Sequence, residues 1–159
     1  MPKTPENSEY KISYKFQERL IQLIDEHDYK TYEFAELACV SKGIIGRATV
    51  YGIIPSVRTL IKIANFFNVS LLYLLGEVDH DDFYASDHPT TFQTRLEELS
   101  QQKNISYSKI AHDMPFPRSF FFDWQRKGTL PSLDYLIAIA EYFDVSVDYL
   151  LGRTEETHN

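Results

Sequence analysis

The sequence predicts an all-α protein made of two tandem copies of one small five-helix domain. The first observation is an internal repeat, because PSVRTLIKIANFFNVSLLYLLG (55–76) returns as PSLDYLIAIAEYFDVSVDYLLG (131–152). The second is periodicity. In the later segment apolar side chains recur at i, i+3, i+4 and i+7, on one face of a helix, at Leu133, Leu136, Ile137 and Ala140. No stretch shows the sustained alternation that is typical of a half-buried strand.

The repeat extends well beyond these two segments. Residues 16–76 align with 92–152 without a gap, at a constant offset of 76 positions, and roughly a third of the aligned pairs are identical. The identical pairs include Phe16/Phe92, Arg19/Arg95, Leu20/Leu96, Ala35/Ala111, Gly52/Gly128, Pro55/Pro131 and Leu60/Leu136. A gapless match of this length indicates a tandem duplication.

Each copy is expected to contain five short helices joined by connections of a few residues. The first copy has helical patterns near 15–26, 31–38, 42–50, 56–67 and 71–75, and the second near 92–103, 107–113, 118–126, 132–143 and 147–151. Thr90 and Gln93 have the spacing of a capping box. Ser132 and Ser146 are expected as N-caps, and Gly152 as the left-handed residue that ends the last helix. The expected boundaries are 1–13 for a flexible arm, 14–76 and 92–152 for the domains, 77–91 for an acidic linker and 153–159 for a tail.

Composition favours a folded protein of the cytoplasm. The hydrophobic fraction of 43% is enough for two cores, the N-terminus lacks the apolar core of a signal peptide, and the apolar runs are too short to span a bilayer. One cysteine excludes an internal disulfide framework and fits a reducing compartment. We expect this residue, Cys39, to be a small buried side chain.

The net charge of −7 argues against a polyanionic partner only until its distribution is considered. Residues 77–91 hold five acidic residues and no Lys or Arg, so most of the excess lies in the expected linker. No acidic residue lies between Ala38 and Gly76, which makes this part of the first copy locally basic. In the second copy Asp123 alone offsets the cations of the expected third helix.

With these segments in view, each copy resembles the XRE, or Cro/lambda-repressor-like, helix-turn-helix domain of bacterial and phage regulators. The resemblance depends on RLEELSQQKNIS (95–106) with Ala111, on the ending GTLPSLDYLIAIAEYFDVSVDYLLG (128–152), and on ELACVSKGIIGR (36–47) with Ala35. It implies two lambda-repressor-like domains, each with its third helix in the major groove of DNA and the start of its second helix at the phosphate backbone.

Carried onto this sequence, the resemblance implies two sets of DNA-binding residues. The first copy offers Thr31, Tyr32, Ser41, Lys42, Gly43, Ile44 and Arg47. The second copy offers Tyr107, Arg118, Ser119, Phe120, Phe122, Arg126 and Lys127.

The second copy departs from the family pattern around its third helix. Pro115 and Pro117 flank the turn and change its backbone geometry. Three phenylalanines follow in succession at 120–122, and since one helix face cannot bury all three, at least one is expected to be exposed. Most members have a Trp near the end of the third helix. The second copy has Trp124, which we expect to be a packing residue, where the first has Ala48.

Neither catalysis nor metal binding is indicated. The sequence has no phosphate-binding glycine loop, no nucleophile elbow and no carboxylate pair on a recognisable scaffold, so we expect a protein that is not an enzyme and needs no cofactor. His80, Asp81, Asp82, Asp87 and His88 form a metal-like cluster, but their spacing matches no zinc or EF-hand pattern. A solvated linker is the preferred interpretation.

The resulting hypothesis is a sequence-specific regulator, most simply a repressor, that binds double-stranded DNA through two tandem heads. Because the copies have diverged, its site is expected to be asymmetric, with the heads about one helical turn, roughly 34 Å, apart. The alternative is a protein-interaction or dimerisation module in which one or both heads have lost DNA binding. A homodimer or a protein partner could use the aromatic segment 116–124. A mixed arrangement, in which the first copy binds DNA and the second dimerises, stays open.

Overall fold

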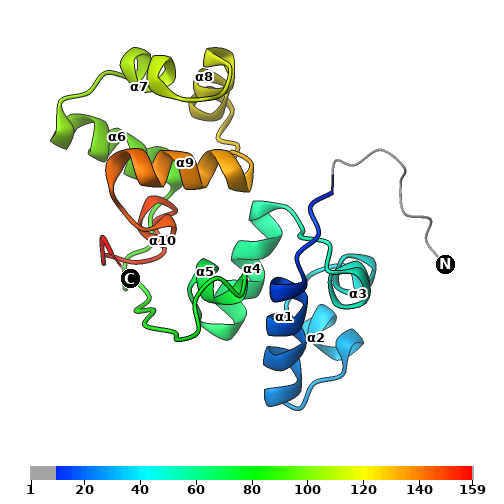
Figure 1. Cartoon of the computed structure of the whole chain (residues 1–159). Coiled ribbons are helices and arrows are strands. Elements are labelled where there is room, and N and C mark those ends of the chain that lie inside the picture. Colours follow the sequence, from blue (N-terminus) through cyan, green and yellow to red (C-terminus); the bar gives the residue numbers. More distant parts are fainter. Residues whose placement is uncertain (1–9, 159) are drawn as a thin grey trace. The chain divides into compact units, whose positions relative to one another are not determined.

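The computed structural model describes residues 10–158, and within this range all regular structure is helical (Figure 1). The chain divides into two compact units, and apart from Ser56–Arg58, which group with the second unit, the division lies between Asp81 and Asp82. Five helices precede it: α1 (Tyr14–Glu26), α2 (Thr31–Leu37), α3 (Lys42–Tyr51), α4 (Val57–Phe67) and α5 (Leu71–Leu74). Five follow: α6 (Phe92–Lys103), α7 (Tyr107–Asp113), α8 (Arg118–Lys127), α9 (Leu133–Phe143) and α10 (Val147–Leu150).

The two units repeat the same helices at the sequence offset. The bounds of α2, α3, α4 and α5 return 76 residues later as those of α7, α8, α9 and α10, and only the first helix of each set differs in its bounds. Every predicted helix is present within about one residue at each end, so the all-α prediction is confirmed for the part of the chain that the structure describes. Residues 1–9 of the predicted arm lie outside it.

Hydroxyl caps begin most of these helices. The side chains of Ser13, Ser41, Ser70, Ser106 and Ser146 each accept a hydrogen bond from the backbone N–H three residues on, as N-caps do. The predicted capping box at Thr90 is wrong by one residue, because the N-cap of α6 is Thr91, which accepts from Thr94 N. Ser132 is at the N-cap position of α9, as predicted, but makes no side-chain cap bond.

Left-handed residues end the helices at matching places in both units. Positive φ occurs at Asp28 and Asn104, Gly52 and Gly128, Asn68 and Asp144, and Gly76 and Gly152. At Gly152 φ is +74°, as predicted for the end of the last helix, and a Cβ there would lie 2.2 Å from Thr90 O. Only glycine fits this site, because the chain passes here directly over the backbone of the segment before α6.

The first unit has a core built on aliphatic and phenylalanine side chains. Its largest fully buried side chains are Phe16, Leu20, Phe34, Ile45, Leu60, Ile63, Leu71 and Leu74. Helix α3 packs against α1 and α2, and α1 also packs against α5. Before α1, Ile12 pairs with Ile53 in an isolated antiparallel bridge, and Ser13 N donates to Gly52 O at 2.8 Å. Residues 10–13 of the predicted arm therefore lie beside the residues that follow α3.

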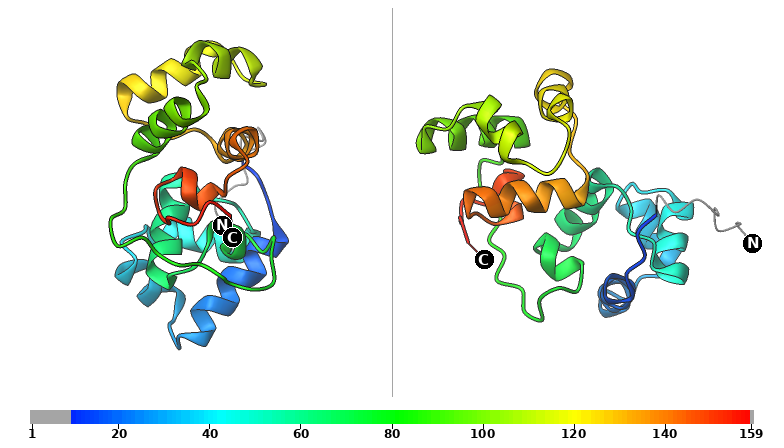
Figure 2. Two further views of the ribbon diagram at one scale, coloured as in Figure 1. Left: turned by 90° about the vertical axis from the view of Figure 1, so that its left-hand side faces the viewer. Right: turned by 45° about the horizontal axis from the view of Figure 1, so that its top comes forward.

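The second unit has a more aromatic core. Phe92, Phe116, Phe121 and Trp124 are buried, and the Trp124 ring contacts Phe92, Phe116, Phe121 and Tyr135. Two additional views show α7 and α8 as a pair of short helices joined by a brief connection (Figure 2). Trp124 is a packing residue, as predicted.

The first two residues of the segment predicted as a tail, Arg153 and Thr154, are instead packed onto the second unit. Arg153 is 6% exposed and Thr154 fully buried, and Arg153 forms a buried ion pair with Asp148. Thr154 Oγ1 donates to Tyr84 O at 2.7 Å, and Ser86 N donates to Arg153 O at 2.9 Å. The residues that precede the first helix of this unit and those that follow its last helix thus hold one another in place.

One arginine performs the same structural role in each unit. The guanidinium of Arg19 lies 3.8 Å from the centre of the Tyr73 ring and donates to Tyr73 O at 2.6 Å. The guanidinium of Arg95 lies 4.0 Å from the centre of the Tyr149 ring and donates to Thr154 O at 3.4 Å. Each arginine joins the first helix of its unit to the end of the unit by cation–π stacking and a backbone bond.

Candidate nucleic-acid interface

The connection between α2 and α3 is a tight turn with a left-handed residue at its centre. Ala38 is the C-cap of α2, and Cys39 has φ +57°. Val40 is buried, and its N–H donates to Ala35 O at 2.9 Å. Ser41 then caps α3 by accepting from Ile44 N at 3.2 Å. The prediction that Cys39 is buried is wrong, because its backbone conformation leaves the side chain exposed while Val40 takes the inward position.

Helix α3 has a buried face and an outer face with little side-chain bulk. Ile45 and Ala48 are fully buried, whereas Lys42 and Gly43 are exposed and Arg47 is half-buried. The Arg47 side chain extends back over Gly43, since a Cβ at position 43 would lie 3.2 Å from Arg47 Nη1. With glycine at 43 and at 46, little side-chain bulk separates this face from an approaching ligand.

The outer face of α3 is also electrostatically positive. Neither Lys42 nor Arg47 has an ion-pair partner among residues 10–158, and no acidic residue occurs from 39 to 75. Their charges are therefore available to an anion, as in side chains that hold DNA phosphates or the acceptor edge of guanine.

A glutamine on the first helix holds the far end of the third helix in each unit. Gln17 Nε2 donates to Thr49 O at 2.8 Å and to Val50 O at 3.1 Å. In the second unit Gln93 Nε2 donates to Trp124 O at 3.3 Å and to Thr129 O, just beyond α8, at 2.8 Å, so the two glutamines share a position but bond to different backbone groups. This pair was not predicted, although glutamine stands at the same position of both copies, a signal that could have revealed it.

The other predicted residues of the first unit surround α3. Thr31 and Tyr32 are exposed in the first turn of α2, which packs against α3, and Ser41 is exposed as its cap. Ile44 is half-buried, with less surface than Lys42 available to a partner. The structure therefore brings the predicted set together on two adjoining helices of one unit.

In the second unit the corresponding turn has a different backbone. The C-cap of α7, Met114, is extended (φ −86°, ψ 150°), and Pro115 follows where the first unit has left-handed Cys39. Proline cannot adopt positive φ, so the tight turn of the first unit is closed to this sequence. Pro117 takes the N-cap position of α8 and offers no side-chain acceptor.

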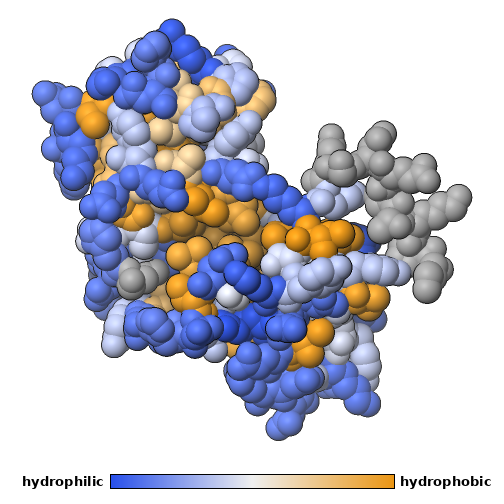
Figure 3. Space-filling view, viewed as in Figure 1, coloured by the Kyte–Doolittle hydropathy of each residue, from blue (hydrophilic) through white to orange (hydrophobic). Residues whose placement is uncertain are grey.

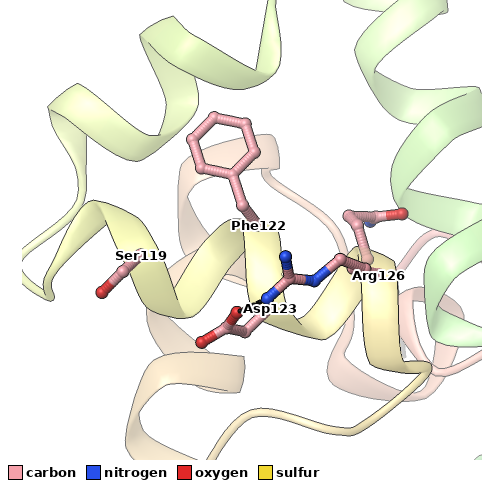
Figure 4. A pocket seen from close by; sticks show the side chains of 5 residues that line it. Ser119, Phe122, Asp123 and Arg126 are labelled. Carbon is pink, nitrogen blue, oxygen red and sulfur yellow. Dashed lines mark hydrogen bonds and ion pairs between the residues drawn. The ribbon is translucent and has the colours of Figure 1, made fainter.

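The outer face of α8 carries aromatic rings among its charges. Phe121 is fully buried, while Phe120 is 42% and Phe122 44% exposed, so the prediction that at least one would be exposed is confirmed. Asp123 Oδ1 accepts from Arg126 Nη2 at 3.1 Å, an ion pair that Figure 4 shows along the helix. The other predicted residues of α8, Arg118, Ser119 and Lys127, are exposed.

Two tyrosines of the second unit have raised pKa values. Tyr107, predicted to contact DNA, packs with its ring centre 5.4 Å from that of Phe121, and burial with the nearby Glu97 raises its pKa. The pKa of Asp113 is lowered because its carboxylate accepts from Tyr142 Oη at 2.8 Å and from Lys109 Nζ at 3.1 Å. The pKa of Tyr142 is raised by desolvation and by this bond.

Comparison with known proteins identifies the first unit. The family model described as "Helix-turn-helix" matches residues 20–74. These residues form a helix-turn-helix domain. The chain is also similar to YobD of Bacillus subtilis (strain 168), described as an uncharacterized HTH-type transcriptional regulator, with 31% identity over 62 residues. The match covers 39% of this chain and 55% of YobD, so it spans about half of that relative's length. No solved structure matches.

Neither a metal centre nor a membrane span is found in the described part of the chain. Within residues 10–158, no three His, Cys, Asp or Glu side chains are placed to hold a metal ion together. None of the helices described is long and apolar enough to cross a membrane.

Proposed function

We propose that this protein is a transcriptional regulator that binds double-stranded DNA in a sequence-specific manner, with α3 as its recognition helix. The observation that carries the proposal is the outer face of α3, where Lys42 and Arg47 flank an exposed glycine on a domain of the helix-turn-helix family. A helix of this kind fits the major groove, where an arginine can bind guanine and a lysine can hold a phosphate. Ser41, Thr31 and Tyr32 are the proposed backbone contacts.

We propose further that the second unit is a duplicated head. Its support is the common offset of the helices, and the glutamine at the same position of each first helix, Gln17 or Gln93, that bonds to the backbone of the third helix. For DNA reading by this unit, Arg118, Arg126 and Lys127 are the available cations. A protein contact is its competing function, favoured by the exposed Phe120 and Phe122 and by the acid Asp123 on the same helix. Repression follows most simply from the proposed binding, because a bound protein covers its DNA site.

The test is a selection of genomic fragments by the purified full chain at about 150 mM salt, followed by affinity measurements on the recovered motif. Lys42→Ala/Arg47→Ala is expected to weaken binding by about tenfold to a hundredfold. It should also lower the slope of log K against log salt by about 0.9 for each phosphate that the variant no longer neutralises. Arg118→Ala/Lys127→Ala measures the part played by α8 in the same way.

Two further variants distinguish specific recognition by α3 from a general effect of positive charge on DNA binding. Lys15→Ala/Lys103→Ala removes two positive charges from α1 and α6 and is expected to change affinity by less than about threefold. Gly43→Ala adds only a methyl group, but that group displaces the Arg47 guanidinium, so it should alter affinity or base preference without loss of stability. Recovery of no motif by the wild type, or equal binding by the α3 double variant, would overturn the proposal.

A further inference from the structure

The outer face of α3 continues beyond Arg47 to an exposed valine. Val50 lies in the last turn of the helix and is 64% exposed, more than any other apolar side chain of α3. Gly43, Arg47 and Val50 are spaced as i, i+4 and i+7, so they share one side of the helix, away from the buried Ile45 and Ala48. In the space-filling view, apolar residues in orange lie beside pale residues of intermediate hydropathy where α3 reaches the surface (Figure 3).

The position of the Val50 side chain is fixed by the bonds at the end of α3. Gln17 Nε2 donates to Thr49 O at 2.8 Å and to Val50 O at 3.1 Å. The C-cap of the helix, Gly52, accepts through its carbonyl from Ser13 N at 2.8 Å. Valine also has one strongly preferred rotamer in a helix. Its two methyl groups are therefore offered to a partner with little loss of side-chain entropy.

An apolar group at this place matches one feature of the major groove. Among the four bases, thymine alone carries a methyl group there. At a rise of about 1.5 Å per residue, Val50 lies roughly 4.5 Å along the helix axis from Arg47, which is between one and two steps of about 3.4 Å between base pairs. When Arg47 binds a guanine, as in the proposed function, Val50 is expected to reach a base pair one or two steps away.

The second unit has different groups at the same positions of its third helix. The residues that correspond to Gly43, Gly46, Arg47 and Val50 are Ser119, Phe122, Asp123 and Arg126, which with Gln125 line a shallow hollow on α8 (Figure 4). Arg126 puts a charge in the place of the valine and pairs with Asp123 at 3.1 Å. An arginine offers no methyl group to a base, so a methyl contact of this kind belongs to the first unit alone.

We propose that Val50 is a specificity-determining residue that packs against the C5 methyl group of a thymine in the major groove. The inference rests on the proposed function and deepens it, because it names a base that the end of α3 reads. The contact removes methyl groups from water, so loss of either partner should weaken binding about threefold to tenfold. Since Val50 neutralises no phosphate, its replacement should leave the slope of log K against log salt unchanged.

The experiment uses the DNA motif recovered by the full chain and replaces its thymines one at a time with deoxyuridine, which lacks only the methyl group. The wild type should lose affinity about threefold to tenfold at one thymine, one or two base pairs from the guanine that Arg47→Ala no longer distinguishes. Val50→Ala should bind the thymine and deoxyuridine duplexes equally well at that position. The coupling between the two changes measures the contact itself, because groups that do not touch have additive effects.

Matched variants separate this contact from general effects on binding. Val50→Thr keeps one methyl group at the same place and should retain part of the preference for thymine. Lys42→Ala removes a charge from the same helix and should weaken binding to both duplexes by the same factor. Thermal unfolding reports that each variant is folded, and Val50→Ala should be at least as stable as the wild type because alanine is the better helix former.

The failure of this inference and the failure of the proposed function have different signatures. Recovery of no motif by the wild type overturns both together. A motif without a thymine one or two base pairs from that guanine overturns the inference alone. The same holds for a motif whose affinity no deoxyuridine changes, and for a preference for thymine that is as strong in Val50→Ala as in the wild type.

Discussion

The third helices of the two units have equal lengths but different surroundings. Ala48 of α3 is fully buried and lets α3 pack closely along α1. At the same position α8 has Trp124, whose ring stands between the helices with its centre 6.5 Å from that of Phe92 on α6, and α6 and α8 do not pack closely. The larger side chain therefore goes together with looser packing between the first and third helices of the second unit, although the third helix has corresponding ends in both units.

The turns that precede the third helices also differ between the two units. In the first unit, left-handed Cys39 and the capping serine Ser41 make a compact reversal. In the second, Pro115 and Pro117 prevent it, and Phe116 is buried with its ring centre 4.7 Å from that of Tyr135. The first unit keeps a small, glycine-containing outer face, and the second has an aromatic interior that continues onto its surface. Two units with the same order of helices can thus present surfaces of different kinds.

The largest expected effect is the loss of stability when Trp124, whose ring stands between α6 and α8, is removed. Trp124→Ala should destabilise the second unit by about 3–5 kcal/mol, because it leaves a cavity among Phe92, Phe116 and Phe121. Urea unfolding followed by far-UV circular dichroism measures the loss. The reciprocal change Ala48→Trp should cost the first unit at least about 1–3 kcal/mol through overpacking against α1. A cost for Trp124→Ala below about 1 kcal/mol would contradict the role of the ring as the spacer.

A smaller difference is expected at the glycines that end the third helices. Both have positive φ, but a Cβ at Gly52 would lie 2.9 Å from Ser13 O, whereas nothing lies within 4 Å of one at Gly128. Gly128→Ala should cost about 1 kcal/mol for the left-handed backbone alone, and Gly52→Ala about 2–3 kcal/mol, because the bond from Ser13 N to Gly52 O must also shift. Equal costs would mean that the segment before α1 yields freely. Thermal unfolding of the two variants makes the comparison.

The smallest expected effect is a pH dependence of the stability of the second unit. Tyr142 and Lys109 hold the pKa of Asp113 below its ordinary value of 3.8, and a lowered folded pKa adds stability above that value that is lost as the pH falls through the folded pKa. The first unit has Leu37 and Phe66 at the positions of Asp113 and Tyr142. Tyr142→Phe should lower Tm by only about a degree at pH 7, since the group is exposed. That difference should vanish as the pH falls below 3.8 and through the lowered pKa of Asp113. A difference that persists at the acid end would assign the loss to packing of the ring.

The sequence by itself determined the helices of this protein and their recurrence at a constant offset. Helix ends depend on local features that can be read along the chain, such as the serine before α10 and the left-handed glycine after it, and apolar spacing shows which side is buried. Because the offset between the two repeats is constant, an inference made for one unit can be checked at the corresponding position of the other. The candidate residues of α3 could be named in advance because of the resemblance to a known family, and the burial of Ile45 and Ala48 shows which side of this helix faces the core.

Only the tertiary structure decided how these elements hold one another. The bonds of Gln17 and Gln93 to the end of the third helix, the stacking of Arg19 and Arg95 on tyrosines, and the burial of Thr154 each join residues more than 30 positions apart or on different elements. Such contacts depend on the path of the chain in space, which periodicity does not encode. The tertiary structure also decided which side chains are exposed. The backbone of a turn exposes Cys39, and the packing of the core buries Phe121 and leaves two phenylalanines of α8 exposed.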